Sequence, residues 1–157
     1  MKKIPLTQGK FALVDDGDFE WLNQWKWCYD RYAVRSIQKS KNQRMLWFMH
    51  WSIIGKPPKG LETDHINGDK LDNRKNNLRI VTRSQNMMNK KRQKNNTSGF
   101  KGVSRSKEKK KWYARICYQG KEYFIGSFNN EKEAAKAYNI KAKEYFGTFA
   151  LFNKIHI

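Results

Sequence analysis

Apolar and polar positions divide the chain into short segments, and their spacing predicts its elements. In residues 1–54, apolar runs such as KFALV alternate with polar turns such as DDGD, which predicts short strands. We expect Trp21, Trp25 and Trp27 to form a compact core there. The apolar stretch RMLWFMHWSIIG ends at a glycine followed by two prolines, so its length and its stop favour a helix.

The next segment predicts a strand, a loop, a second strand and a helix. Residues 61–67 alternate weakly between apolar and polar side chains, and residues 68–77 are rich in Gly, Asp and Asn. The run LRIVT is β-branched and predicts the second strand. TRSQ matches the capping-box pattern, so a helix should start near Thr82 and continue through SQNMMNKK.

A change of pattern follows at KRQKNNTSG, which is polar and basic and predicts a linker at residues 91–97. Beyond it, FKGVSRS, KWYARICYQ and KEYFIGSF predict three strands, with a turn at QGK. The last segment is amphipathic, and it predicts a helix ending at Gly147. Its apolar face comprises Ala134, Tyr138, Ala142 and Tyr145. The predicted fold class is α+β, with a mixed N-terminal region followed by a three-stranded antiparallel sheet packed on one helix.

The net charge of the chain indicates a binding surface. The 157 residues contain 33 Lys and Arg against 14 Asp and Glu, a net charge of +19. The excess is spread over the chain, at +4 in residues 1–50, +7 in 51–98 and +8 in 99–157. Basic residues interleaved with aromatic ones, as in KEKKKWYARICYQGKEYF, are typical of proteins that bind nucleic acid.

Other classes of protein are disfavoured. No apolar run reaches the roughly 18 residues that a membrane span needs, and the basic N-terminus has no apolar core behind it. Cys28 and Cys117 stand far apart without a CxxC motif, which argues against a zinc ribbon or a disulfide framework. We therefore expect a cytoplasmic protein with two reduced thiols, no membrane partner and no small-molecule substrate.

The candidate chemistry lies in LETDHINGDKLDNRKNNLRIVTRSQNMMNK, residues 61–90. A carboxylate from Asp64 and an amide oxygen from Asn86 are donors that suit a hard cation such as Mg²⁺, with Mn²⁺ as the other possibility. Neighbours on a strand project to opposite sides of the pleat, so His65 can face the site while Asp64 reaches in from its edge. A histidine there can accept a proton from water in phosphodiester hydrolysis. Asn77, at the exit of the loop, can fix the ring or the backbone of His65 through a hydrogen bond.

The stretch DHINGDKLDNRKNNLRIVTRSQNMMN resembles the HNH nucleases, specifically the phage and intron homing endonucleases with a ββα-metal core. The resemblance implies that Asp64 and Asn86 hold one divalent ion, that His65 is the general base and that Asn77 orients His65. FMHWSIIG is similar to the helix that precedes the motif in the family, although Trp51 stands where Arg is usual. The implied setting is DNA in a bacterial or phage-infected cell.

Each of these residues also has a simpler interpretation. An isolated Asp–His pair is more often a hydrogen-bonded loop pair than a catalytic one, and only the spacing to Asn77 and Asn86 favours catalysis for His65. His50 is interpreted as a histidine of the core or of the helix surface and is not assigned a catalytic role. Asn73 and Asn76 are interpreted as turn formers.

Residues 98–153 resemble a second family, the APETALA-two or ethylene-response-factor DNA-binding domain. The matches GV, KWYARI, IGSF, EAAKAY and FGTFALFN occur in the family's order. Ser104 stands where plant members often have Arg, and Arg115 where many have Glu, so the plant target sequence does not transfer. Phage-borne homing endonucleases pair this domain with an HNH core.

The resemblance implies that basic and aromatic residues of this domain contact DNA. Trp112 is interpreted as half core and half stacking surface, while the basic residues are either readers of a DNA groove or a solvated face. The candidates are Lys101, Arg105, Lys111, Trp112 and Arg115.

Together these patterns predict a metal-dependent endonuclease that acts on double-stranded DNA as a monomer. A β-rich region and helix at residues 1–54 would support an HNH core at 55–90, with targeting by residues 98–153. The alternative is a sequence-specific DNA-binding regulator with an inactive nuclease core. An RNA-binding protein is a third possibility, disfavoured because no RRM, KH or zinc-knuckle pattern is present.

Overall fold

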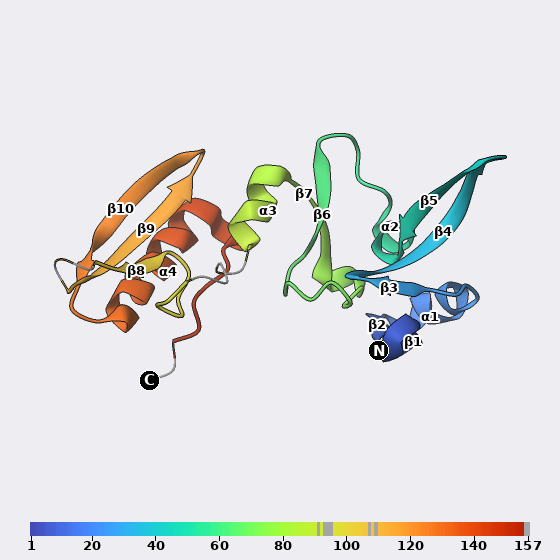
Figure 1. Ribbon diagram of the computed structural model, residues 1–157, viewed down its shortest axis with the longest axis horizontal. Coiled ribbons are helices and arrows are strands. Elements are labelled where there is room, and N and C mark those ends of the chain that lie inside the picture. Colours follow the sequence, from blue (N-terminus) through green and yellow to red (C-terminus); the bar gives the residue numbers. More distant parts are fainter. Residues whose placement is uncertain (91, 93–95, 107, 109, 156–157) are drawn as a thin grey trace. The chain divides into compact units, whose positions relative to one another are not determined.

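The computed structural model describes residues 1–157 except 91, 93–95, 107, 109, 156 and 157. The chain forms two compact units, residues 1–83 and 84–157, and each is described by itself. Small antiparallel sheets and a few helices make up both units, which confirms the predicted α+β class (Figure 1). Part of the predicted linker at 91–97 lies outside the described residues.

The first unit begins with a β-hairpin and a helix. Strands β1 (Lys2–Pro5) and β2 (Phe11–Val14) pair antiparallel around the 3-10 turn η1 (Thr7–Gly9), and helix α1 (Asp16–Asn23) follows directly. The sequence interpretation of DDGD as a turn between strands was wrong. Asp16 and Asp18 occupy the first turn of α1, where carboxylates interact favourably with the exposed N–H groups of a helix.

A three-stranded sheet in the order β3-β4-β5 comes next. Its strands are β3 (Cys28–Asp30), β4 (Tyr32–Ser40) and β5 (Gln43–Phe48), and helix α2 (Met49–Ile54) follows. The helix predicted for RMLWFMHWSIIG is therefore half wrong, because its first residues form β5. A short apolar run can form a helix or a strand. Residues 43–48 form a strand because they pair with β4, for example across Arg35–Trp47 and Ile37–Met45.

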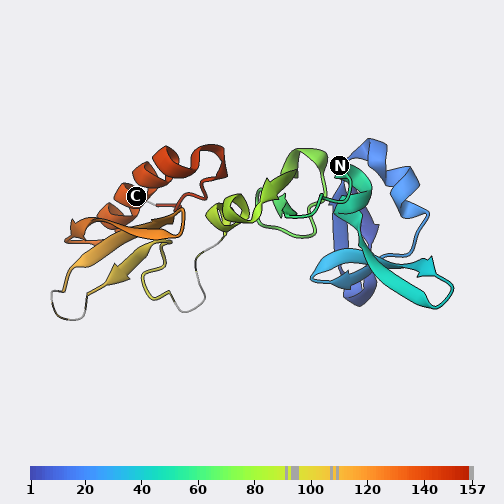
Figure 2. The ribbon, with the colours of Figure 1, turned by 90° about the horizontal axis from the view of Figure 1, so that it is seen from above.

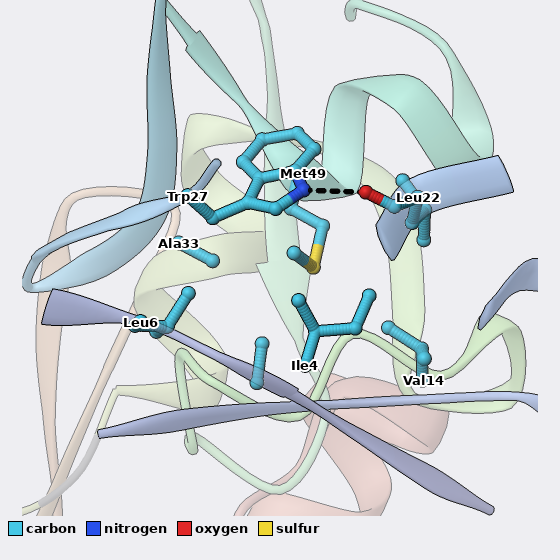
Figure 3. Close-up of a cluster of buried hydrophobic side chains, with 8 residues drawn as sticks. Ile4, Leu6, Val14, Leu22, Trp27, Ala33 and Met49 are labelled. Carbon is cyan, nitrogen blue, oxygen red and sulfur yellow. Dashed lines mark hydrogen bonds between the residues drawn. The ribbon is translucent and has the colours of Figure 1, made fainter. Parts of the chain in front are cut away.

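The core of the first unit joins these elements (Figure 3). Trp27 is buried at 3% exposure, and its indole Nε1 donates a 2.9 Å hydrogen bond to the Leu22 carbonyl oxygen. Trp21 and Trp25 are only half-buried and pack against the cluster from outside, so the predicted tryptophan core holds for Trp27 alone. The buried members are Ile4, Leu6, Ala12, Val14, Leu22, Trp27, Ala33 and Met49.

The predicted order of strand, loop, strand and helix is confirmed. Strand β6 (Leu61–His65) pairs antiparallel with β7 (Leu78–Thr82), and the loop between them ends in the 3-10 turn η2 (Lys75–Asn77). Helix α3 (Arg83–Asn89) follows β7 directly in the sequence. Because β6 and β7 are only five residues long, the long loop between them needs further contacts to fix it.

The second unit contains a three-stranded antiparallel sheet in the order β10-β9-β8 (Figure 2). Its elements are β8 (Val103–Arg105), β9 (Trp112–Tyr118), β10 (Lys121–Phe128), α4 (Glu131–Phe146) and the 3-10 turn η3 (Gly147–Phe149). Gln119 and Gly120 both have positive φ, as a two-residue hairpin turn requires, which confirms the turn predicted at QGK.

Helix α4 lies along one face of this sheet and closes the second core (Figure 2). Its first turn is capped by the Asn130 side chain, which accepts a hydrogen bond from the Glu133 backbone N–H. Ala134, Tyr138 and Ala142 are buried, as their spacing predicted. Gly102 is needed for this contact, because a Cβ at its positive φ would lie 2.2 Å from the Tyr138 ring.

Candidate catalytic site

The pairing of β6 with β7 places the Asp–His pair in a buried position. Asp64 is 6% exposed and His65 5% exposed. Asp64 lies opposite Arg79 in the register, and the Arg79 guanidinium donates to its Oδ2 from Nε at 2.9 Å and from Nη2 at 2.8 Å. Arg79 therefore holds the Asp64 carboxylate in a fixed orientation next to His65.

The His65 ring lies against aromatic residues of the preceding sheet and helix. Its centroid is 5.3 Å from the His50 ring and 6.0 Å from the Tyr32 ring. Burial lowers the pKa of His65 below 6.5, while Asn73, Asp64 and nearby acidic groups oppose the shift. Since the lowering dominates, the ring is neutral at neutral pH and can accept a proton.

His50 itself is a buried histidine of the core, as the sequence interpretation held. It is 5% exposed, stacks on Phe48 and makes an edge contact with Tyr32. Burial, with a smaller contribution from His65, lowers its pKa to about 3. The ring is thus uncharged at any working pH, and its Nδ1 makes no hydrogen bond with the described residues.

A hydrogen-bond network fixes the loop that follows His65. The Asn77 Oδ1 accepts from the Asn67 backbone N–H at 2.9 Å, and its Nδ2 donates to the Asp72 carbonyl oxygen at 2.8 Å. The Asn77 carbonyl oxygen accepts from the Ile66 N–H at 2.9 Å, one residue after His65. The Asn77 side chain therefore holds the loop that follows His65, and a role for it in orienting His65 itself stays a prediction.

Asp72 forms the second fixed point of the loop. It is 2% exposed, and Arg74 donates to both of its carboxylate oxygens, from Nε at 2.8 Å and from Nη2 at 2.6 Å. Asn67 Nδ2 adds a third hydrogen bond at 2.8 Å. Arg74 is the main cause that lowers the pKa of Asp72. The carboxylate stays charged and bonded, so it serves as an anchor for the loop.

The N-terminal hairpin holds the same loop from outside. The Leu13 N–H donates to the Leu71 carbonyl oxygen, and the Asn73 N–H donates to the Leu13 carbonyl oxygen, both at 2.8 Å. Asp15 Oδ2 accepts from the Lys75 N–H at 2.8 Å, and the Lys75 ammonium lies 3.1 Å from Asp18. Residues near the start of the chain thus complete the support of the candidate catalytic loop.

Asn73 is a site residue that sequence reasoning missed. It was interpreted as a turn former, yet it is fully buried at 0% exposure, and its side chain raises the pKa of His65. The Asn73 Oδ1 is buried and makes no hydrogen bond of standard geometry with the described residues. Nothing in the sequence pattern separates Asn73 from the exposed Asn76.

The predicted cation ligands divide between the two units. Asp64 lies in the first unit, and Asn86 lies half-buried on α3 in the second, so their joint use stays a prediction. A carboxylate and an amide oxygen are the donor types that Mg²⁺ takes. Within the described ranges, no group of three or more His, Cys, Asp or Glu side chains is placed to hold a metal ion.

The predicted DNA-binding residues of the second unit have different surroundings. Arg115 is exposed on β9 and lies 3.4 Å from Glu122, and the Lys111 ammonium donates to Asn129 at 2.6 Å. Arg105 is exposed and lies over the half-buried Trp112, 5.7 Å from its ring centroid. These residues keep their cationic groups at the surface.

Lys101 differs, because it is half-buried. Its Nζ donates to the Met88 carbonyl oxygen near the end of α3, and its backbone N–H donates to Asn153. Burial lowers the pKa of Lys101 to about 8. A surface role in DNA binding is therefore less direct for Lys101 than for the other candidates.

The sheet face opposite α4 carries two aromatic residues that the sequence did not single out. Phe124 is 59% exposed, and its ring lies 5.5 Å from Tyr113. Arg115 lies next to both, directly across from Phe124 in the register and 5.8 Å from the Tyr113 ring. The alternation of β9 and β10 would have shown that these side chains face away from the helix.

Comparison with known proteins decides the family. A protein described as an uncharacterized HNH endonuclease, L560 of Acanthamoeba polyphaga mimivirus, is 32% identical over 149 residues. The match covers 94% of this chain and 77% of that protein. The chain belongs to the HNH endonuclease family. Membership supports a nuclease activity and implies a DNA substrate.

Other comparisons agree with membership in the HNH endonuclease family. The family model described as HNH endonuclease matches residues 43–88, which run from β5 into α3 and include the Asp64–His65 pair. Protein 3.8 of Escherichia phage T7 is 37% identical over 103 residues, which cover 65% of this chain and 84% of that protein. An ethylene-responsive transcription factor of Arabidopsis thaliana, WRI1, is 38% identical over 58 residues, 36% of this chain and 14% of that protein.

No solved structure gives a significant match to this HNH family member. Among the described residues, no helix is long and apolar enough to cross a membrane.

Proposed function

We propose that the chain is a divalent-metal-dependent endonuclease that hydrolyses phosphodiester bonds in double-stranded DNA. The observation that carries the proposal is the buried Asp64–His65 pair at the end of β6, followed by a loop whose backbone is fixed on both sides. General bases work when their position is set before the substrate arrives. An imidazole that is neutral at neutral pH has the chemistry to take a proton from water, which supports His65 as the general base.

In this proposal His65 accepts a proton from the water that attacks the phosphorus. Asn77 keeps the backbone beside His65 in place, and Asn73 limits rotation of the imidazole. Asp64 and Asn86 supply the oxygen donors that would hold Mg²⁺ or Mn²⁺. Such an ion, when bound, stabilises negative charge on the phosphate and the leaving oxygen.

The C-terminal unit would bring the nuclease to its DNA. Arg115, Tyr113 and Phe124 form a basic and aromatic patch on the open face of a three-stranded sheet. The partial likeness to an ethylene-responsive transcription factor supports the same role. We expect a monomer that selects sites as a homing endonuclease does, with the sequence preference residing in this unit.

Incubation with supercoiled plasmid tests the metal-dependent activity. We expect nicked or linear DNA with Mg²⁺ or Mn²⁺, and intact plasmid with EDTA. An Asp64→Asn variant should lose plasmid cleavage with Mg²⁺ while it still binds DNA. Equal cutting in EDTA would contradict the metal role, whereas no cutting with any divalent ion would contradict the nuclease assignment.

One observation favours the alternative of a DNA-binding regulator with an inactive core. Arg79 occupies Oδ2 of Asp64 with two hydrogen bonds, so a cation must compete with an existing ion pair. The same plasmid assay separates the two functions. Tight sequence-specific binding without cleavage under any divalent ion would establish the regulator.

A further inference from the structure

Helix α3 groups with the second unit, although the nuclease-like sequence runs through it. The family match covers residues 43–88, whereas the division into compact units falls between Arg83 and Ser84. The helix has only seven residues. Isolated helices shorter than about 12–15 residues are marginal in water, so a helix of this length depends on tertiary contacts. The contacts that α3 makes within the second unit are therefore part of what keeps it folded.

Met88 attaches α3 to the core of the second unit. Its half-buried side chain packs against a cluster formed by Ile116, Tyr138, Ala142 and Phe146. The flexible thioether side chain of methionine adapts well to an irregular apolar surface of this kind. The neighbouring Met87, by contrast, is 55% exposed. The apolar contact therefore fixes which side of the helix is turned toward the core.

Lys101 holds the end of the same helix. Its Nζ donates to the carbonyl oxygen of Met88, one residue before α3 ends. The last carbonyl groups of a helix lack partners within it, and a cation is favourable beside them. With a pKa of about 8 the ammonium is still charged at pH 7. In the part of the chain that the structure describes, no carboxylate forms an ion pair with it, so the carbonyl group is its defined partner.

Lys101 is in turn fixed to helix α4. Asn153 Oδ1 accepts from the Lys101 backbone N–H at 2.7 Å, and Asn153 Nδ2 donates to the Lys101 carbonyl oxygen at 3.0 Å. The Asn139 side chain, on α4, makes the same pair of bonds to the backbone of Asn153, at 2.8 and 2.9 Å. Hydrogen bonds thus connect α4 with the end of α3 through two asparagines and one lysine.

The attachment through Met88 determines the direction of Asn86. Side chains two positions apart on an α-helix point in nearly opposite directions, because successive residues are rotated by about 100°. Ser84, Met87 and Met88 line a cavity of the second unit, and Asn86 is not among the described residues that line it. The Asn86 amide is therefore turned away from the core to which α3 is attached.

We propose that Met88 and Lys101 are positioning residues of the nuclease, because they hold α3 in the orientation that presents Asn86 to the metal ion. The inference rests on the proposed function, in which Asn86 shares that ion with Asp64. The second unit would then do more than bind DNA, since it also holds one of the metal ligands in place. A ligand that is already ordered loses less conformational entropy on binding than a ligand on a fraying helix. Metal affinity should therefore depend on how firmly α3 is attached.

Amide hydrogen exchange of the full-length chain in EDTA tests the attachment without metal or cleavage. Met88→Ala removes the apolar contact, and Lys101→Met removes the donor to the Met88 carbonyl oxygen. In both variants the amides of Met87 and Asn89 should exchange about tenfold faster, after correction for intrinsic rates. The amides of Ile116 and Ala142 should stay close to their wild-type rates, which shows that the core of the second unit is intact.

The Mn²⁺ dependence of plasmid cleavage tests the consequence for the metal site. We expect the Mn²⁺ concentration for half-maximal cleavage to rise about tenfold in Met88→Ala and in Lys101→Met. The rate at saturating Mn²⁺ should return close to that of the wild type. A variant that is only partly unfolded would instead lose maximal rate and keep the wild-type Mn²⁺ requirement. Binding of a fluorescent DNA duplex in EDTA should be unchanged in Met88→Ala.

Met87→Ala is the matched control, because Met87 is the same residue type on the same helix but is exposed. We expect it to keep the wild-type exchange rates and Mn²⁺ requirement. Equal exchange at α3 in Met87→Ala and Met88→Ala would overturn the proposal, as would a wild-type Mn²⁺ requirement in both Met88→Ala and Lys101→Met. Absence of cleavage by the wild type with any divalent ion would instead contradict the proposed function itself.

Discussion

The two units present their polar side chains in opposite ways. Around His65, the residues Asp64, Asp72, Asn73 and Asn77 are all below 7% exposure, and most are bonded to defined partners. On the sheet of the second unit, Arg115 and Phe124 stand in solvent. Chemistry on a phosphate needs groups held in place before binding, whereas a recognition surface can adjust its side chains to the groove that it meets.

The difference predicts that the first region tolerates substitution poorly and the second tolerates it well. Burying a polar group without its partner costs more than the hydrogen bond contributes, so changes in the catalytic loop should affect folding as well as activity. An exposed arginine on a sheet can be replaced with little effect on stability. Activity, affinity and unfolding measurements on the same variants can therefore separate the two regions.

The largest expected effect is on catalysis at His65. His65→Ala removes the proposed general base and should reduce cleavage about 10²–10⁴-fold, because proton transfer contributes that much to the rate. DNA affinity in EDTA should stay nearly unchanged. Plasmid cleavage and gel shifts measure the two quantities, and circular dichroism checks the fold.

His50→Phe is the matched control for that variant. His50 is equally buried, and a phenyl ring can replace its stacking on Phe48. We expect cleavage within tenfold of the wild type, because the His50 Nδ1 makes no hydrogen bond with the described residues that Phe would lose. Loss of DNA binding in His65→Ala would instead show that His65 is structural.

Asn77→Ala should lower the stability of the first unit as well as its activity. The substitution leaves the Asn67 N–H and the Asp72 carbonyl oxygen without their partner, and the bond to the Asp72 carbonyl oxygen is buried, at a cost of about 1–3 kcal/mol. Urea unfolding followed by tryptophan fluorescence measures the loss, since five of the six tryptophans lie in the first unit.

The variant Asn77→Asp separates the two hydrogen bonds of the Asn77 side chain. It keeps an oxygen for the Asn67 N–H but loses the donor to Asp72, so an intermediate stability is expected. If Asn77→Ala unfolds at the wild-type urea concentration, the loop is held by other contacts and Asn77 does not support His65.

Arg115→Ala should affect recognition without affecting folding. Its side chain is exposed, and its bond to Glu122 is a long surface pair of small value. An arginine that reads a base edge contributes about 1–3 kcal/mol of discrimination, so selection from a random-sequence duplex pool should become less specific. Lys141→Ala, on α4, serves as the control. A uniform loss of affinity across all sequences would assign Arg115 to phosphate instead.

Much of the catalytic region could be predicted because its signals are local. LRIVT forms β7 to the residue, the Gly, Asp and Asn content located the loop, and the capping-box pattern located the following helix. The aromatic N-terminal region could not be predicted as well. DDGD contains the residues of a turn and also those of a helix start, and only the packing of Leu22 and Phe19 onto the hairpin decides for α1.

The environment of individual site residues was the least predictable part. Asp64 and His65 were expected on opposite sides of a strand, yet both are buried. Tyr32 of β4 and His50 of α2 lie against the His65 ring, and the Arg79 guanidinium pairs with the Asp64 carboxylate. Asn73 is buried only because β2, sixty residues earlier, bonds to its backbone. Contacts of such sequence separation leave no periodic signal.

The smallest expected effect concerns Lys101 and pH. Its pKa is about 8 in the folded chain against an ordinary value of 10.5, so between these values the unfolded chain binds more protons than the folded one. Stability of the second unit should therefore rise with pH across that window, and Lys101→Met should remove this contribution. Amide exchange at Ile116 and Ala142, compared between the two proteins at each pH, cancels the intrinsic pH dependence.

Lys111→Met is the matched control, because Lys111 is exposed and its substitution should leave the wild-type pH dependence in place. If Lys101→Met and the wild type show the same rise from pH 8 to 10.5, then Lys101 is solvated in solution. It would then belong with Arg105 and Lys111 among the surface cations, and the contrast between a buried first region and an exposed second one would become sharper.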